Sequence, residues 1–289
     1  MGIKLITDSA CDLPIEYIKE NNIEFASLSV NIKGEFLIDD LGQTLKYDDF
    51  YKMVREGEMP STSQVNVGEF EEIFTKHVEN GDSIIYIGLS SNLSGTFNSA
   101  AIAREMVLGK YPKADISIID SLSASLGEGS LVYYACEMIK NGSSKEEVIN
   151  WVEDNKRRVI HAITVDDLSH LKRGGRISGA TAIVGGLLNI KPTLKFDNEG
   201  RVKPGNKIKG RKKVIKYLAE QVKENAVNIE EQVIFICHGD CLSEAEVLKE
   251  IILSEVKPKG VVINSIGAVI GSHGGPGALA VIFMAKERY

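Results

Sequence analysis

The sequence predicts an α/β fold of two domains, with a parallel sheet and flanking helices in the first and a mixed sheet in the second. Its 289 residues fit one large or two medium domains. Before residue 155, β-rich runs alternate with helical patterns, which is typical of a parallel sheet covered by helices. Beyond it, strand-like runs follow one another with few helices between them, which indicates hairpins and a mixed sheet. We therefore expect domains at residues 1–155 and 156–289, packed tightly with a cleft between them.

In the first half, runs of β-branched residues predict strands, and apolar residues at helical spacing predict helices. Strands are expected at residues 4–7, 25–32, 83–89 and 116–120. Helices are expected at residues 13–21, 48–55, 67–80, 98–109 and in much of 126–158. Pro14 suits the first turn of its helix, and Pro60 introduces a polar loop at residues 61–64.

The second half has more strand-like runs and two long helical patterns. Strands are expected at residues 161–165, 192–196, 202–208, 233–237, 261–266 and 279–285. Helices are expected at residues 211–225 and 243–255. A short segment at residues 177–188 is apolar and rich in glycine.

Composition excludes some classes of function. Lys and Arg number 34 against 40 Asp and Glu, a formal charge of −6, whereas a general nucleic-acid binder should show a basic excess. The N-terminus does not read as a signal peptide, and no apolar run reaches the roughly 18 residues of a membrane span. The 4 cysteines are scattered without Cys-x-x-Cys spacing, so we expect a reducing, cytoplasmic location.

Residues 89–100 form the most informative segment, in which a strand ends, hydroxyl residues and a glycine follow, and a helix begins. Unpaired N–H groups at a helix N-terminus attract anions, and Gly95 allows the backbone to approach a ligand closely. The hydroxyl of Ser94 can donate one more hydrogen bond to a carboxylate or phosphate. Helix capping by Ser94 or Thr96 explains the same pattern equally well.

Three other segments carry polar residues that suit an anion. Residues 60–64 are a second hydroxyl cluster, although such runs usually serve as turns. His273 lies among four glycines and a proline in residues 271–277, where a tight turn is expected and the histidine either binds an anion or satisfies the turn. Arg173 and Arg176 flank a pair of glycines, and their guanidinium groups suit carboxylate or phosphate, with a solvated loop as the alternative.

Other signatures of chemistry are weak or missing. Cys237 and His238 are adjacent, so a strand would point them apart, and zinc binding is disfavoured. Gly205 and Gly210 have the spacing of a phosphate-binding loop, but Arg211 and Lys212 replace the required Lys-Ser/Thr. A dinucleotide fingerprint and a Gly-x-Ser-x-Gly elbow are absent from the sequence. The sequence therefore favours a binding protein without a cofactor.

Taken together, the segments resemble the DegV family, the fatty-acid-binding subunits of bacterial fatty acid kinase. The matching motifs lie in order at residues 7–14, 60–64, 89–100, 171–178, 238–240 and 271–277. The resemblance implies a lipid bound between two α/β domains, with its carboxylate held by Thr62, Ser94 beside Gly95, and His273. Gly274 stands where the family usually has a hydroxyl or apolar residue, and residues 26–28 lack a proline often found there.

The resemblance also implies a carrier that presents the fatty acid carboxylate to a separate ATP-using kinase catalytic subunit. The acyl phosphate formed there then passes to phospholipid synthesis, with an acyltransferase and a transient membrane contact as further expected partners. Arg173, Arg176 and Arg201 are the expected contacts with the kinase. We expect the acyl chain to lie against apolar side chains of the segment 177–188, with ordinary core packing as the alternative: Ile183, Val184, Leu187 and Leu188.

Two other classes of function compete with a carrier. An autonomous hydrolase or phosphotransferase would use Ser94 and His273, but no motif places a carboxylate to orient the histidine. A regulatory module that senses lipid or binds DNA is disfavoured by the acidic balance.

Overall fold

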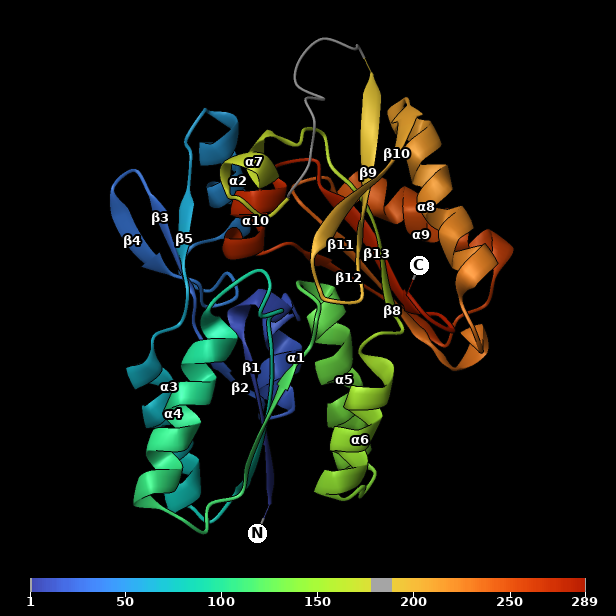
Figure 1. Cartoon of the computed structure of the whole chain (residues 1–289). Helices are drawn as coiled ribbons and strands as arrows, with labels where there is room; N and C mark the ends of the chain where they lie inside the picture. Colours follow the sequence, from blue (N-terminus) through green and yellow to red (C-terminus); the bar gives the residue numbers. More distant parts are fainter. Residues whose placement is uncertain (1, 178–188, 289) are drawn as a thin grey trace.

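The structure, a computed structural model, describes residues 2–177 and 189–288. Their strands form a four-stranded, a six-stranded and a three-stranded sheet. In Figure 1 the four-stranded sheet lies in the lower half, the six-stranded sheet at the upper right and the three-stranded sheet at the upper left. The predicted α/β class, with a parallel sheet followed by a mixed one, is confirmed.

The N-terminal sheet has the strand order β2-β1-β6-β7, and all its pairs are parallel. The strands are β1 (Ile3–Asp8), β2 (Glu24–Ala26), β6 (Ser83–Gly88) and β7 (Ile116–Asp120). Its helices are α1 (Ile15–Glu20), α3 (Val67–Glu79), α4 (Thr96–Lys110), α5 (Leu126–Lys140) and α6 (Lys145–Asn155), with a 3₁₀ turn at Ser9–Cys11. Figure 1 shows α3 and α4 on one face and α5 and α6 on the other. Residues 84–87 are therefore buried in succession, as expected of a strand covered on both sides.

The C-terminal sheet is mixed, with the order β10-β9-β8-β13-β11-β12. Its strands are β8 (Val159–Thr164), β9 (Ile190–Phe196), β10 (Val202–Lys209), β11 (Val233–His238), β12 (Gly260–Ser265) and β13 (Leu279–Met284). The pair β11 and β12 is parallel, whereas the other pairs are antiparallel. Helices α8 (Arg211–Asn225) and α9 (Leu242–Glu255) pack against this sheet, and a 3₁₀ turn at Ile229–Glu231 precedes β11.

The two faces of the C-terminal sheet enter different cores because side chains alternate along a strand. Ile160 and Ala162 of β8 belong to the core under α8 and α9. Helix α5 packs on the opposite face, where Tyr133 meets Phe235 edge to face with ring centroids 5.4 Å apart. That second face of the C-terminal sheet faces the N-terminal sheet.

The three-stranded sheet, in the order β4-β3-β5, corrects two predictions. It consists of β3 (Ser29–Ile32), β4 (Glu35–Ile38) and β5 (Ser61–Ser63). The single strand predicted at 25–32 is split between two sheets, because the N–H groups of Ser27 and Leu28 donate to the side chains of Glu69 and Ser9 instead of a strand. The loop predicted at 61–64 is largely β5, an edge strand whose polar composition hid it.

Three short helices complete the described residues: α2 (Tyr47–Arg55), α7 (Ser169–Arg173) and α10 (Ala268–Gly274). The tight turn predicted at residues 271–277 is wrong for His273, which lies in the last turn of α10, but a turn does follow at residues 276–277 before β13. The helix forms because Gly271 N–H donates to the carbonyl of Gly267, and it ends where Gly275 adopts a φ of 74°.

Buried carboxylates tie the N-terminal half of the chain to α10. The N–H of Gly267 donates to Asp12 at 2.9 Å, and that of Val269 donates to Asp39 at 3.4 Å. All strands of the four-stranded sheet precede Asn155, and all strands of the six-stranded sheet follow it. The domain boundary near Asn155 nevertheless stays a prediction, because α2, β3 and β5 contact α10 from the other half.

Candidate ligand-binding site

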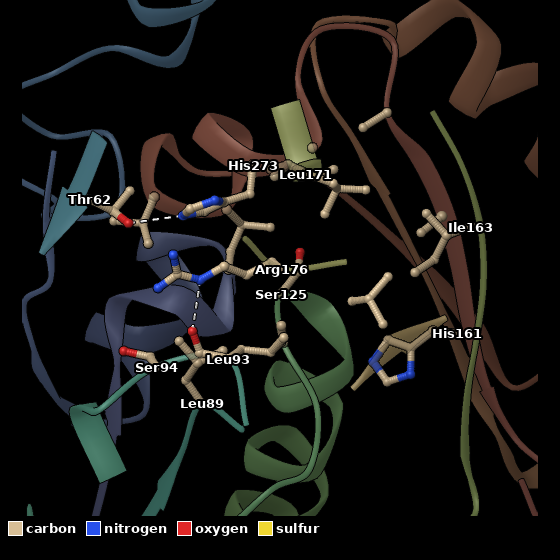
Figure 2. A pocket seen from close by; sticks show the side chains of 18 of the residues that line it. Thr62, Leu89, Leu93, Ser94, Ser125, His161, Ile163, Leu171, Arg176 and His273 are labelled. Carbon is tan, nitrogen blue, oxygen red and sulfur yellow. Dashed lines mark hydrogen bonds between the residues drawn. The ribbon is translucent and has the colours of Figure 1, made fainter. Parts of the chain in front are cut away.

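A cavity of about 410 Å³ lies where the two large sheets and the three-stranded sheet meet. It is next to the loops that follow β6 and β7, the carboxyl ends of parallel strands, where α/β sheets commonly bind ligands. Most of its described lining is apolar, including Leu28, Leu89, Ile163, Leu194, Val269 and Ile282. Hydroxyl, imidazole and guanidinium groups gather at one side of it, as Figure 2 shows.

Thr62 and His273 form the first part of this polar end. Thr62 Oγ1 lies 2.9 Å from Nε2 of His273. Strand β5 presents the threonine, and α10 presents the histidine from the opposite half of the chain. If Nε2 carries the proton and donates to Thr62, the threonine hydroxyl is free to donate to a ligand.

Ser94 lies in the loop between β6 and α4, where it bonds to the first residue of the helix and lines the cavity. Its Oγ accepts the N–H of Thr96 at 3.2 Å and lies 2.9 Å from Thr96 Oγ1. Thr96 Oγ1 in turn accepts the N–H of Val65 at 3.4 Å. When Thr96 donates its own proton to Ser94, the proton of Ser94 remains available to a ligand in the cavity. The capping alternative is wrong in detail, since the N-cap is Gly95 without a side-chain capping bond, whereas a role of Ser94 toward an anion stays a prediction.

Position 95 requires glycine because the side chain of Gln64 lies against it, and not because of its backbone angles. A Cβ at this position would overlap the side-chain oxygen of Gln64. Gln64 also lines the cavity, and its Nε2 donates to Ser99 Oγ at 2.9 Å. The sequence pattern contained Gln64 in the hydroxyl cluster at 60–64 but did not single it out, because only the fold brings it against Gly95.

The protein environment favours the neutral form of His273. Burial, followed by the charges of Arg176 and Arg173 and by His170, lowers the pKa of His273 from 6.5 to about 4. Its Nδ1 is buried without a hydrogen-bond partner, and a Cβ on Gly174 would overlap it. With cations near it and no anion bonded to it, the polar end is suited to receive a negative charge.

Arg176 was expected at a protein partner, but it also lines the cavity. Its Nε donates to the carbonyl of Leu93 at 3.0 Å, and another nitrogen donates to the carbonyl of Gly174. Figure 2 shows its guanidinium between His273 and Ser94. Arginine suits a carboxylate because it offers several fixed donors. The sequence indicated that Arg176 suits a carboxylate but not that it lines the cavity, because the residue reaches the cavity through tertiary packing.

The other two expected partner contacts lie outside the cavity lining. Arg173 is exposed and bonds to Nδ1 of His170 at 3.0 Å. Arg201 is exposed, donates to Asn92 at 3.1 Å beside the Ser94 loop, and pairs with Glu199. Their role toward a partner stays a prediction.

The predicted acyl-pocket residues Ile183, Val184, Leu187 and Leu188 lie outside the described residues. The apolar wall that the structure describes includes side chains from β8, β9, β13 and α10. Ser125 also faces the cavity, but its hydroxyl donates to the buried carboxyl of Asp12.

The described geometry does not assemble a serine hydrolase from Ser94 and His273. Ser94 bonds to Thr96, and His273 bonds to Thr62. No described carboxylate bonds to Nδ1 of His273, as the orienting member of a triad would. Among residues 2–177 and 189–288, no three His, Cys, Asp or Glu side chains are grouped to hold a metal ion.

No helix in the described part of the chain has both the length and the apolar character needed to cross a membrane.

Comparison with known proteins identifies relatives along nearly the whole chain. A family model described as DegV, an uncharacterised protein family, matches residues 2–286. A DegV domain-containing protein of Clostridium perfringens is 49% identical over 284 residues, covering 98% of each chain.

Solved structures agree with this result. A DegV family protein from Thermus thermophilus, described for its fatty acid binding, has a TM-score of 0.88 at 31% identity, covering 99% of this chain and 100% of its own. DegV from Bacillus subtilis, described as a fatty acid binding protein, has a TM-score of 0.83 at 34% identity with the same coverage.

Proposed function

The chain belongs to the DegV family, and from this premise and the cavity geometry we propose that it binds a fatty acid. The carboxylate lies at the end formed by Thr62, Ser94, Gly95 and His273, and the acyl chain extends into the apolar part. The observation that carries the proposal is the separation of polar and apolar lining within one cavity of about 410 Å³.

The two parts of the cavity supply different contributions to binding. Burial of the acyl chain contributes affinity, at roughly 0.8 kcal/mol per methylene. A buried carboxylate costs several kcal/mol unless hydrogen bonds compensate for its lost hydration. The hydroxyls of Thr62 and Ser94 and the guanidinium of Arg176 line the same end and offer that compensation.

We infer further that the chain is a carrier whose partner supplies catalysis. A separate ATP-dependent fatty acid kinase subunit would phosphorylate the carboxylate held at this end. The carrier would then deliver the acyl phosphate to an acyltransferase of phospholipid synthesis, in transient contact with the membrane. The bonding of His273 to Thr62 rather than to Ser94 supports binding over autonomous hydrolysis. Arg173 and Arg201 are our candidates for the kinase contact.

Mass spectrometry of lipid released from the denatured, purified protein tests the first step. We expect about one fatty acid per chain, with much less in variants Thr62→Ala, Ser94→Ala and His273→Ala. A protein that is empty and also fails to take up oleate or palmitate would refute fatty acid binding.

The carrier step has its own test. The loaded protein, ATP and a DegV-associated kinase subunit should together form an acyl phosphate, trapped with hydroxylamine, while omission of either protein abolishes it. The variants Arg173→Ala and Arg201→Ala should raise the KM of the kinase for the loaded carrier. Lys213→Ala, an exposed cation on α8, is the charge-matched control. Normal fatty acid loading without any acyl phosphate would refute the kinase proposal alone.

A further inference from the structure

One buried imidazole in the cavity wall is not explained by carboxylate binding. His161 on β8 is 3% exposed and lines the cavity, and neither ring nitrogen has a hydrogen-bond partner among residues 2–177 and 189–288. In Figure 2 it lies apart from Thr62 and His273, below Ile163. Buried polar groups are nearly always hydrogen-bonded, so the absence of a protein partner for this imidazole requires a structural or functional explanation.

The surrounding fold holds this ring in place. Alternation along β8 turns His161 and Ile163 toward the cavity, while their neighbours enter the other core. The imidazole stacks on Phe196, with ring centroids 4.1 Å apart and an interplanar angle of 23°. A Cβ on Gly127 would overlap Nε2 of His161, so the first turn of α5 leaves space for the ring.

The ring is neutral, which limits what it can bind. Burial, followed by the charge of Arg288, lowers the pKa of His161 well below its ordinary value. The backbone carbonyls of Ala124 and Val159 lie near enough to favour protonation, but neither has the geometry of a hydrogen bond with a ring nitrogen. A neutral imidazole has one donor nitrogen and one acceptor nitrogen. It therefore suits a hydroxyl, which can bond to either nitrogen, better than it suits a second carboxylate.

Two polar side chains of the cavity wall outside the carboxylate end bond to other protein groups. Ser125 donates to Asp12, and Gln64 donates to Ser99. Of the described side chains lining the cavity, only His161 and His273 have a buried nitrogen without a partner, and His273 belongs to the carboxylate end.

We propose that His161 hydrogen-bonds a hydroxyl group on the acyl chain, so that the cavity accepts a hydroxylated fatty acid in preference to its unsubstituted counterpart. This inference rests on the proposed function, since it names the class of fatty acid bound by the same cavity. The hydroxyl lies away from the carboxylate, because His161 and the Thr62–His273 pair occupy different parts of the wall.

A second cavity of about 170 Å³ also borders His161 and is lined by polar residues, including Thr193, Asn206 and Tyr217. Water in that cavity is the competing partner for the imidazole. If water satisfies the ring, removing its nitrogens changes the binding of substituted and unsubstituted chains equally.

Competition between fatty acids tests the proposal. Delipidated protein is incubated with equimolar stearic acid and one of 2-, 10- or 12-hydroxystearic acid, and the bound ratio is measured by extraction and mass spectrometry. We expect one of the two distal hydroxyl positions to be preferred over stearic acid and the 2-hydroxy acid to show no such preference. In His161→Leu that preference should fall about tenfold, the scale of one hydrogen bond. His161→Gln keeps a donor and an acceptor and should retain part of it.

Ile163→Ala is the matched control, because Ile163 lines the same face of β8 without a polar group. It should weaken both acids without changing their ratio. Equal ratios in the wild type and His161→Leu at every hydroxyl position would refute the role of His161 while leaving fatty acid binding intact. Failure of the wild type to bind either acid would refute the proposed function and this inference with it. The wild-type preference needs no variant, so a misfolded variant does not prevent the test.

Discussion

Thr62 and His273 are 211 residues apart in the chain, yet Thr62 Oγ1 and His273 Nε2 lie 2.9 Å from each other. The pair joins an edge strand from the first half of the chain to a short helix from the second. The polar end of the cavity therefore exists only when both halves are folded and docked.

We expect Thr62→Ala and His273→Ala to weaken fatty acid binding about tenfold or more, because a hydrogen bond to a charged group contributes about 1.5–3 kcal/mol. Thr62→Ser keeps the hydroxyl and should bind nearly as well as the wild type. Ser61→Ala changes an exposed neighbour on the same strand and is the control. Titration calorimetry with oleate measures the effect, and equal affinity in Thr62→Ala and the wild type would exclude Thr62 as a ligand.

Arg176 should control the protonation of His273. Since its positive charge is the largest contribution after burial to the lowered pKa of His273, Arg176→Gln should raise that pKa. Arg173→Gln removes a smaller contribution and should raise it less. Histidine titration by NMR in the delipidated protein measures both shifts, and an unchanged pKa in Arg176→Gln would contradict the electrostatic account.

His273 should also make stability depend on pH. Its pKa falls from 6.5 to about 4 on folding, so between these values the unfolded chain binds a proton that the folded protein does not. The contribution of His273 to stability is therefore complete above pH 6.5 and declines as the pH falls toward 4. The loss amounts to roughly 3 kcal/mol at most.

Other buried groups titrate in the same range, so a paired measurement is needed. Burial raises the pKa of Asp8 to about 6 and that of Asp39 to about 7. Ionisation of these two carboxyls therefore destabilises the folded protein as the pH rises, opposite to the effect of His273. Urea denaturation of the wild type and His273→Gln at each pH isolates the histidine. A difference in unfolding free energy that stays constant from pH 7 to about pH 4 would contradict the lowered pKa.

Gly127→Ala should destabilise the protein by about 1–3 kcal/mol, because the added methyl group would displace the imidazole of His161. The double variant Gly127→Ala/His161→Ala should recover part of that loss relative to His161→Ala alone. Gly109→Ala, also in a helix but with no atom within 4 Å of the added Cβ, is the control and should be neutral or stabilising. Additive effects in the double-mutant cycle would show that the two residues do not interact.

Arg288 should stabilise the C-terminal end of the chain. It is 4% exposed and donates to the carbonyls of Val159, Asp197 and Lys156 and to Ser123 Oγ. Arg288→Ala leaves these acceptors buried and should cost about 3 kcal/mol in thermal or denaturant unfolding. Lys286→Ala, exposed in the same segment, should change stability by less than about 0.5 kcal/mol. Comparable losses in the two variants would exclude a specific role for Arg288.

The sequence predicted regular elements better than it predicted their arrangement. The helix at residues 211–225 and the strand at 116–120 have the expected bounds, because their periodicity is strong. The short strand carrying Thr62 was missed because a run of Ser and Thr has the composition of a loop, and only pairing with β3 makes it a strand. His273 was assigned to a turn because its glycines obscured the helical pattern of α10.

The candidate site was only partly visible for a related reason. Motifs identified Thr62, Ser94 and His273, and the fold brings all three to one cavity. Arg176 was noted as suited to an anion but assigned to a protein partner, and His161 was not singled out. Which side chains face a cavity depends on sheet order and register that no local pattern contains. The roles of Arg176 and His161 as ligands are proposals that rest on the structure.

The attachment of α10 to both halves of the chain has a consequence for unfolding. This helix carries His273 at its end and is held at its beginning by Asp12 and Asp39. A ligand that contacts both Thr62 and His273 links the two halves of the chain reversibly. It stabilises the folded protein more as the free ligand concentration rises above Kd. The loaded protein should therefore melt at a higher temperature than the empty protein.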